Sequence, residues 1–307
     1  MTPLSEKILS DWQVRKTKNQ KTAFIDFMQS EIPGLKVEQG GFGNNRNLVL
    51  GDIKTADVVM TAHYDTCARL PFPNFISPKN IPLYLGYSLL LCIPFGIFAG
   101  VLNALLHLVT DSFLITYWGT FLPTMALLFY LFMGGTPNPH TANDNTSGVI
   151  TLCELIAAMT DEQKARTAFV FFDNEENGLL GSSWFRKLHK KDGVDTKLLI
   201  NFDCVSDGDH MLFVLSKPAR KVYGKAFEEA FQNTAEKTVY IEKSSTTMYP
   251  SDQASFPVGV GVAALKKKRG VGLYMNRIHT IHDTVFQQEN IAYLVEGILR
   301  LINIIKE

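Results

Sequence analysis

One long segment of the chain is almost free of charge. Between Lys79 and Asp144, the only Asp, Glu, Lys or Arg is Asp111. Apolar spans flank this aspartate at about residues 83–109 and 113–133, and each reaches the roughly 20 residues that a helix needs to cross a bilayer. Aromatic residues lie near the proposed span ends, as in the aromatic belts of membrane proteins: Tyr84, Tyr87, Tyr117, Trp118 and Tyr130. Residues 80–134 therefore predict a transmembrane helical hairpin.

The alternative is a soluble arrangement of the same segment. An apolar helical pair could cap a binding site or form a dimer interface instead. Span length and charge depletion favour the membrane. Gly96 and Gly100 also have the GxxxG spacing that lets two membrane helices approach closely.

Outside the hairpin, short apolar strands alternate with amphipathic helices. The segment TAFVFFD at residues 167–173 is typical of a strand, whereas residues 288–307 have apolar side chains at helical spacing. This alternation predicts an α/β fold whose mostly parallel central sheet has helices on both faces. We see no internal repeat or linker, so residues 1–79 and 135–307 are interpreted as one domain that carries the hairpin as an insertion.

The composition excludes some classes of function. Thirty Lys and Arg balance thirty Asp and Glu, so no overall basic field indicates a nucleic-acid partner. The first twenty residues lack an apolar signal core, and we expect no cleaved export signal. Reduced thiols rather than disulfides are expected for the four scattered cysteines, Cys67, Cys92, Cys153 and Cys204.

Acidic and histidine side chains follow the ends of several expected strands, or lie in turns between elements. These residues are His63 and Asp65 in TAHYDT, Asp144 in TANDNTSG, Glu175 and Glu176 in FFDNEEN, Asp203 in NFDC, and His279, His282 and Asp283 in RIHTIHDT. Ligands in open α/β sheets bind outside the carboxyl ends of the strands. We therefore expect these side chains to converge on one crevice.

Several carboxylates in one crevice are costly unless cations lie among them. No group of arginines or lysines accompanies the motifs, and two divalent metals would supply the missing charge. Zinc accepts imidazole nitrogen and carboxylate oxygen and can leave a position open for water. Two such ions about 3.5–4 Å apart can activate one water and polarise a carbonyl. Cobalt or manganese could accept the same ligands.

Five motifs occur in a fixed order: HxD, NDNxSG, EENGLxGS, NFD and HTxxDT, from His63 to Thr284. In this order they resemble the M28 family of co-catalytic zinc metallopeptidases, most of which are aminopeptidases. The resemblance implies a mixed-sheet α/β fold with two zinc ions in one pocket. It also implies that His63 and Asp203 bind the first zinc, Glu176 and His279 bind the second, and Asp144 bridges the two.

The same resemblance assigns roles to the remaining groups. Glu175 would be the general base that takes a proton from water held between the metals. Asp65 would hydrogen-bond the far nitrogen of His63, a support that metal-bound histidines usually have. The Asp144–Asn145 peptide would be cis. Glu175 and Glu176 are adjacent carboxylates, and their repulsion would be relieved because one binds metal while the other faces the water.

Three further positions near the motifs need interpretation. The ligand histidine of the last motif directly precedes threonine, which selects His279 and makes His282 an exposed or supporting residue. Asp283 is expected to brace the loop. The segment SDQASF at residues 251–256 resembles the SDHxxF segment beside the family's substrate pocket, with Gln253 in place of histidine. That departure concerns specificity rather than the catalytic groups.

The hairpin has consequences for topology. His63 and Asp144 must reach the same metals, so the chain has to return to the side of the bilayer it left, and two crossings satisfy this. Arg69 and Lys79 then lie on the catalytic side, which the positive-inside tendency puts in the cytoplasm. The run KKKR at residues 266–269 is either a solvated loop or a contact for anionic headgroups.

The sequence therefore predicts a membrane-anchored dizinc aminopeptidase that acts on peptides at or near the bilayer. Amide chemistry on the same scaffold, such as glutaminyl cyclisation with one zinc, is an alternative. A non-catalytic membrane scaffold is another, and the complete set of ligands and the general base argue against it.

Overall fold

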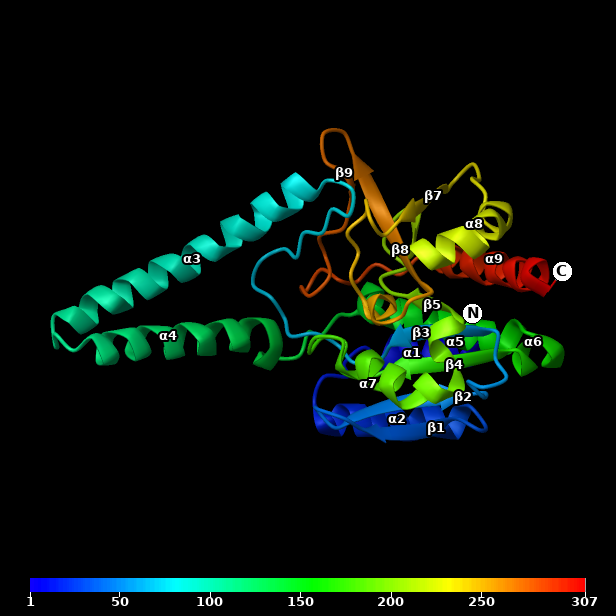
Figure 1. Ribbon diagram of the computed structural model, residues 1–307, viewed down its shortest axis with the longest axis horizontal. Helices are drawn as coiled ribbons and strands as arrows, with labels where there is room; N and C mark the ends of the chain where they lie inside the picture. The colour runs from blue at the N-terminus through cyan, green and yellow to red at the C-terminus, as the bar shows by residue number, and fades with distance from the viewer. Residues whose placement is uncertain (307) are drawn as a thin grey trace.

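A mixed β-sheet forms the centre of the molecule in the computed structural model, which describes residues 1–306 (Figure 1). The predicted domain end at residue 307 lies outside the described residues. The strands are β1 (Lys36–Gly40), β2 (Asn45–Leu50), β3 (Val58–His63), β4 (Thr167–Phe172), β5 (Leu198–Phe202), β6 (His210–Leu215), β7 (Thr238–Lys243), β8 (Gly259–Lys268) and β9 (Gly272–Tyr274).

The strand order is β1-β2-β4-β3-β5-β8-β6-β7, and β9 pairs with β8. The four central strands, β4, β3, β5 and β8, run parallel to one another. Towards the edges, β1-β2, β2-β4, β6-β8 and β8-β9 are antiparallel pairs. At one edge, β6 and β7 form a further parallel pair. This architecture confirms the predicted mixed α/β fold, with three parallel pairs at the centre of the sheet.

Helices cover both faces of the sheet. They are α1 (Pro3–Asp11), α2 (Lys18–Glu31), α5 (Ser147–Ala158), α6 (Asp161–Ala165), α7 (Leu180–Leu188), α8 (Lys217–Ala230) and α9 (Gln288–Lys306). Along β3, Val58 and Met60 face the core that contains α1, α2, α5, α8 and α9, whereas Val59 faces a second core with Phe185 of α7. This alternation is the two-residue period of a strand that is buried on both faces.

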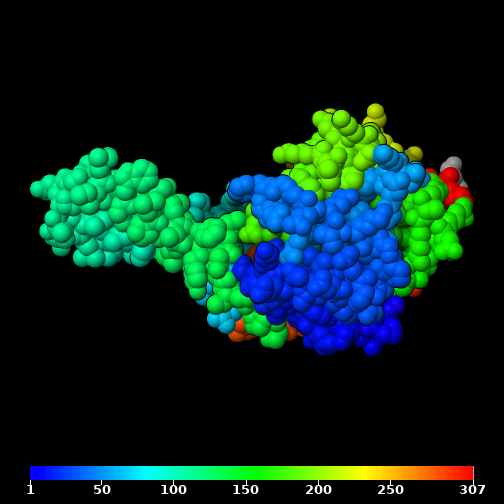
Figure 2. Space-filling view, turned by 90° about the horizontal axis from the view of Figure 1, so that it is seen from below, coloured from blue at the N-terminus to red at the C-terminus, as the bar shows by residue number. Residues whose placement is uncertain are grey.

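The two apolar spans form a helical hairpin that projects from the sheet domain (Figures 1 and 2). They are α3 (Ile81–His107) and α4 (Phe113–Phe129), and α4 continues as a π-helical turn, Tyr130–Gly134. Within residues 1–306, these are the two helices that are long and apolar enough to cross a membrane, judged by length and composition. Asn103 of α3 donates a hydrogen bond to Thr120 of α4 at 3.3 Å. Most large apolar side chains of the pair are exposed.

Hydrogen bonds tie both roots of the hairpin to the sheet domain, where the first root is the segment at residues 77–80 and the second is the segment at residues 135–136. At the first root, Ser77 donates to the carbonyl of Leu273 at 3.0 Å, and Asn80, the N-cap of α3, donates to the carbonyl of Val271 at 3.1 Å. At the second root, the Arg69 N–H donates to the Thr136 carbonyl at 2.9 Å. The hairpin therefore leaves and re-enters one side of the domain.

The close contact between α9 and α8 yields a test of the packing. A Cβ on Gly297 would lie 2.1 Å from the Phe231 ring, which is buried and packs against Phe213. We expect Gly297→Ala to lower the free energy of unfolding by about 1–3 kcal/mol through overpacking, despite the better helix propensity of alanine. The measurement is thermal unfolding of the full chain in detergent.

The matched control is Gly224→Ala in α8. There the added Cβ meets the side chain of Arg220 at 3.1 Å, which is flexible and partly exposed and can move aside. This variant should keep or slightly raise the unfolding temperature. A Gly297→Ala protein as stable as the wild type would contradict the packing described here.

Candidate metal centre

Three neighbouring strands bring the motif residues to one edge of the sheet. His63 is the last residue of β3, Glu175 and Glu176 follow β4, and Asp203 follows β5. Because β4 and β5 flank β3 in parallel, their carboxyl ends meet at the same edge. Loops supply the other two groups, Asp144 just before α5 and His279 between β9 and α9. The expected convergence is therefore present in the structure.

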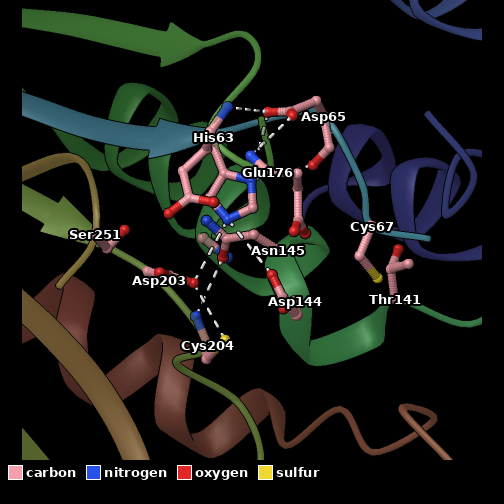
Figure 3. Close-up of polar contacts among 12 residues, drawn as sticks. His63, Asp65, Cys67, Thr141, Asp144, Asn145, Glu176, Asp203, Cys204 and Ser251 are labelled. Carbon is pink, nitrogen blue, oxygen red and sulfur yellow. Dashed lines mark hydrogen bonds and ion pairs between the residues drawn. The ribbon is translucent and has the colours of Figure 1, made fainter. Parts of the chain in front are cut away.

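The Asp144 carboxylate lies between His63, which Figure 3 labels beside it, and His279. Its Oδ1 is 3.4 Å from His63 Nε2, and its Oδ2 is 3.0 Å from His279 Nε2. His63 Nε2 also lies 3.5 Å from Asp203 Oδ1, and His279 Nε2 lies 3.3 Å from Glu176 Oε2. Two groups of nitrogen and oxygen atoms are thus arranged around the two oxygens of one carboxylate.

These distances fit the coordination of zinc. Ligand atoms at about 2.0–2.1 Å from a tetrahedral zinc are about 3.3 Å from one another. The contacts in the two groups are 3.0–3.5 Å. Glu176 Oε1 is buried and has no hydrogen-bond partner within residues 1–306, as expected for an oxygen that accepts a cation. The donor set is therefore suitable for two metal ions.

Asp65 organises the adjacent glutamates rather than hydrogen-bonding His63 through its carboxylate. Its two carboxylate oxygens accept the backbone N–H groups of Glu175 at 3.0 Å and Glu176 at 3.2 Å. His63 Nδ1 lies 3.0 Å from the backbone carbonyl of Asp65 and 3.6 Å from its carboxylate. The longer distance is outside hydrogen-bonding range, so the expected support for His63 comes from the carbonyl of Asp65.

Asp283 and Asn145 hold the loop that carries Asp144. The Asp283 carboxylate accepts the N–H groups of Asn143 at 2.9 Å and Asp144 at 3.0 Å, which agrees with its interpretation as a bracing residue. The Asp144–Asn145 peptide is cis, as the resemblance implied. The side chain of Asn145 bonds the carbonyl of Phe202 at 2.9 Å and so ties the loop to the end of β5.

Burial and mutual repulsion perturb the acids and imidazoles of the cluster. Burial raises the pKa of Glu175 well above its usual value and the pKa of Glu176 to about 8. Burial opposes protonation of His279, but the charges of Glu176 and Asp144 raise its pKa to about 9. Burial would raise the pKa of Asp144, and its contacts with His279 and His63 hold that pKa below the usual value instead. Without metal, the cluster therefore retains protons on its histidines, which bound cations would replace.

Two buried cations near the site were missed by the sequence reasoning. Arg15 is fully buried and donates to the Tyr64 carbonyl at 2.5 Å and to the Thr146 hydroxyl at 3.1 Å. Burial lowers the pKa of Arg15 to about 10, and the nearby charges of Asp65 and Asp144 oppose that shift. Lys21 pairs with Asp173 at 2.6 Å. Both cations come from the N-terminal segment, where no local pattern marks them as parts of a site.

Asp252 is a further buried acid that was missed. Neither carboxylate oxygen has a hydrogen-bond partner within the described chain, and burial raises the pKa of Asp252 to about 7. It precedes Gln253 in the SDQASF segment, so the motif itself could have indicated it. His282, in contrast, is exposed, and it does not line the cavity that contains His279.

The cavity that contains the cluster has a volume of about 360 Å³. Its acidic side is formed by Asp144, Glu175, Glu176 and Asp203. The insertion also contributes to the lining, because Tyr84 in the first turn of α3 borders the cavity. Asn74 and Ile76, which precede the insertion, line it as well. The root of the apolar hairpin and the candidate site therefore share a wall.

Comparisons with known proteins identify relatives of the chain. The model of peptidase family M28 matches residues 129–297. The structure is similar to that of the LapA aminopeptidase of Legionella pneumophila, with 14% identity and a TM-score of 0.55 over 98% of this chain and 67% of that one. It is also similar to the glutaminyl cyclase of Porphyromonas gingivalis, with 14% identity and a TM-score of 0.54 over 98% of this chain and 95% of that one. At these identities the structural likeness shows a shared fold. No curated protein matches the chain.

The position of Asp283 leads to a test of the metal centre. In Asp283→Ala, the N–H groups of Asn143 and Asp144 lose their acceptors and Asp144 is no longer held between the histidines. We expect zinc affinity to fall about 10–100-fold, as for other residues that support metal ligands. Competition with a chromogenic chelator measures this affinity directly.

Asp209→Ala is the control, because the side chain of Asp209 is exposed and contacts His210 rather than the cluster. It should bind zinc as the wild type does. Unchanged zinc affinity in a folded Asp283→Ala protein would show that Asp144 does not need this brace.

Proposed function

The chain belongs to peptidase family M28, and we propose that it is a membrane-anchored dizinc metallopeptidase, most specifically an aminopeptidase. The single observation that carries the proposal is the Asp144 carboxylate, which offers one oxygen to each of two groups of histidine and carboxylate ligands. In this proposal, residues 1–79 and 135–307 form the catalytic domain and residues 80–134 form the membrane anchor.

Five side chains would hold the metals. His63 and Asp203 would hold one zinc, Glu176 and His279 the other, and Asp144 both. Cobalt or manganese could use the same ligands. When bound, the metals would polarise the scissile carbonyl of the substrate and lower the pKa of a coordinated water.

Glu175 would act as the general base and acid of peptide hydrolysis. Its backbone N–H is fixed by Asp65, while its side chain lies close to both His63 and Glu176, so it borders the ligand groups. Glu175 would accept a proton from the attacking water and deliver it to the leaving amine, the usual alternation of a carboxylate in hydrolysis. Asp65 thus acts through Glu175 and Glu176 as a positioning residue.

Glutaminyl cyclisation is the second candidate. The fold likeness to the Porphyromonas gingivalis cyclase over 95% of that chain favours it. The five ligand side chains form two groups that share Asp144, and this arrangement favours the dizinc peptidase instead. A peptide with N-terminal glutamine separates the two, because cyclisation releases ammonia without shortening the peptide, whereas hydrolysis releases the first residue. A non-catalytic membrane scaffold has no need of Glu175 and is the least supported function.

The membrane part of the proposal is supported by the charges at the two roots of the hairpin. Lys79 lies at the first root, and Arg69 lies at the second. The exposed residues 267–269 lie at the end of β8 and the start of the β8–β9 turn, where Asn80 contacts the carbonyl of Val271. The turn between α3 and α4 carries Asp111 and no Lys or Arg. This asymmetry favours a cytoplasmic catalytic domain.

The shared wall at Tyr84 suggests which peptides reach the site. Because Tyr84 lies in the first turn of α3, an anchored hairpin would keep the mouth of the cavity close to the membrane surface. Peptides that are bound to the membrane or newly released there would be favoured as substrates.

Glu175→Gln tests the catalytic role. The variant should retain about two zinc ions per chain, since Glu175 is not a ligand, and it should lose about 10²–10⁴-fold in turnover. The assay uses a short peptide with a free amino terminus and the same peptide acetylated, with metal content determined in parallel.

Cleavage of the free peptide alone supports an aminopeptidase, whereas equal cleavage of both indicates an endopeptidase or a carboxypeptidase. Glu228→Gln on α8, an exposed carboxylate that pairs with Arg220, is the control and should be fully active. A fully active Glu175→Gln protein would rule out the proposed mechanism.

Cysteine labelling tests the membrane anchor. Cys92 lies in α3 and is exposed, whereas Cys67, Cys153 and Cys204 are buried. In native membranes, we expect a charged, membrane-impermeant maleimide to leave Cys92 unlabelled, because the bilayer would cover it. After denaturation in detergent, Cys92 should react.

Sidedness is tested in a Cys92→Ser background. Ser112→Cys, in the turn of the hairpin, should react only from the side opposite to Lys268→Cys at the exposed end of β8. The anchor is disproved if Cys92 is labelled in intact membranes, or if the protein stays soluble without detergent.

A further inference from the structure

A second cavity, of about 580 Å³, adjoins the metal centre. The loop from Ile278 to His282 separates the two. Ile278 and His279 line the catalytic cavity, whereas Thr280, Ile281 and His282 line the second one. The other walls are the segment from Arg69 to Pro73 and the end of the second apolar helix, with Tyr130 and Leu131.

The charge of this cavity is opposite to that of the metal centre. Its lining includes Arg69 and His282 but no Asp or Glu. Arg69 is exposed, and in the described part of the chain its guanidinium has neither an ion pair nor a hydrogen bond. Asn276 and Thr280 add neutral hydrogen-bonding side chains. An anion, rather than a cation or the amino terminus of a peptide, is the ligand that this lining favours.

The position of the cavity selects among anions. Tyr130 and Leu131 belong to the π-helical turn that ends the apolar hairpin, and Tyr130 is 54% exposed. Phe72, which also lines the cavity, packs against Phe132 of the same turn, with the ring centroids 6.1 Å apart. One end of the cavity is therefore continuous with the apolar surface of the hairpin. An amphiphile could place its charged end at Arg69 and its chains along that surface.

We propose that this cavity binds the anionic headgroup of a phospholipid, with the lipid phosphate facing Arg69. The proposal rests on the membrane anchoring proposed above, since an anchored hairpin puts the cavity at headgroup level. Arg69 suits this ligand because its planar guanidinium donates two parallel hydrogen bonds to a phosphate.

The site would also support the metal centre. The Leu70 N–H donates to the His279 carbonyl at 2.7 Å, and Asn138 donates to the Thr280 carbonyl at 3.0 Å. His279 itself has a left-handed backbone, with φ of 60°. Such a conformation persists in a non-glycine residue when its surroundings hold it. A headgroup on the Thr280–His282 side of the loop would therefore help to hold His279 towards the metals.

Lipid binding can be measured without reference to activity. The full chain, delipidated in neutral detergent, is titrated with dioctanoyl phosphatidylglycerol and with dioctanoyl phosphatidylcholine. Inorganic phosphate and a short acidic peptide are then added as competitors of the bound lipid. Native mass spectrometry counts bound lipid, and hydrogen exchange follows the loop at residues 277–283. We expect saturable binding of phosphatidylglycerol in preference to phosphatidylcholine, with slower exchange in the loop.

Two variants locate the binding site. Arg69→Gln should weaken phosphatidylglycerol binding about tenfold or more, the loss expected for a charge-assisted pair, and should abolish the slowing of exchange. Lys268→Gln removes a cation from the exposed end of β8, which does not line the cavity, and should bind as the wild type does.

Three outcomes would overturn the proposal. They are equal binding of the two lipids, equal binding by wild type and Arg69→Gln, and inorganic phosphate or an acidic peptide displacing the lipid at similar concentration. The last would indicate a site for soluble anions or for substrate. Arg69-dependent lipid binding in a protein that cleaves no peptide would refute the proposed catalysis while leaving this inference intact.

Discussion

The crowding of buried carboxylates at one edge of the sheet is the constraint on which the structure depends. Asp144, Glu175, Glu176 and Asp203 lie around two histidines, and none of them contacts a lysine or arginine as an ion pair in residues 1–306. Removing such charges from water costs several kcal/mol each unless cations compensate them. The parallel strands at the centre of the sheet deliver these groups to one place, so the fold itself creates a site that suits a cation.

The hairpin of α3 and α4 is inserted between β3, which carries His63, and the loop that carries Asp144. Ala68 and Pro137 form a β-bridge, so the chain closes behind the insertion before it reaches Asp144. The contact joins the segments before and after the insertion on one side of the domain. Tyr84 reaches back from α3 into the catalytic cavity. Through this residue, the position of the hairpin bears on the shape of the cavity that contains the carboxylate cluster.

Much of this architecture could be predicted from local patterns. The residues of the cluster follow apolar strands, and parallel pairing makes strand ends coincide, so His63 and Asp203 could be expected together before their distance was known. Arg15 could not be found in this way, because its contacts with Tyr64 and Thr146 arise from packing between distant segments. The partner of His63 Nδ1 was also beyond prediction, since it depends on how Asp65 divides its hydrogen bonds between its own carbonyl and carboxylate. The antiparallel pairs β1-β2, β2-β4 and β6-β8 depend on chain reversals that strand and helix patterns do not encode.

The two neighbouring cavities differ in charge but share one loop, and this has a thermodynamic consequence. If an anion beside Arg69 holds the loop in the arrangement that presents His279, it binds that arrangement more tightly than any other. Linkage then requires that metal at His279 strengthen anion binding by the same factor. Because the anion would be a membrane component, a chain away from its membrane would hold its second metal less tightly. The same loop would in this way couple the activity of the centre to its location.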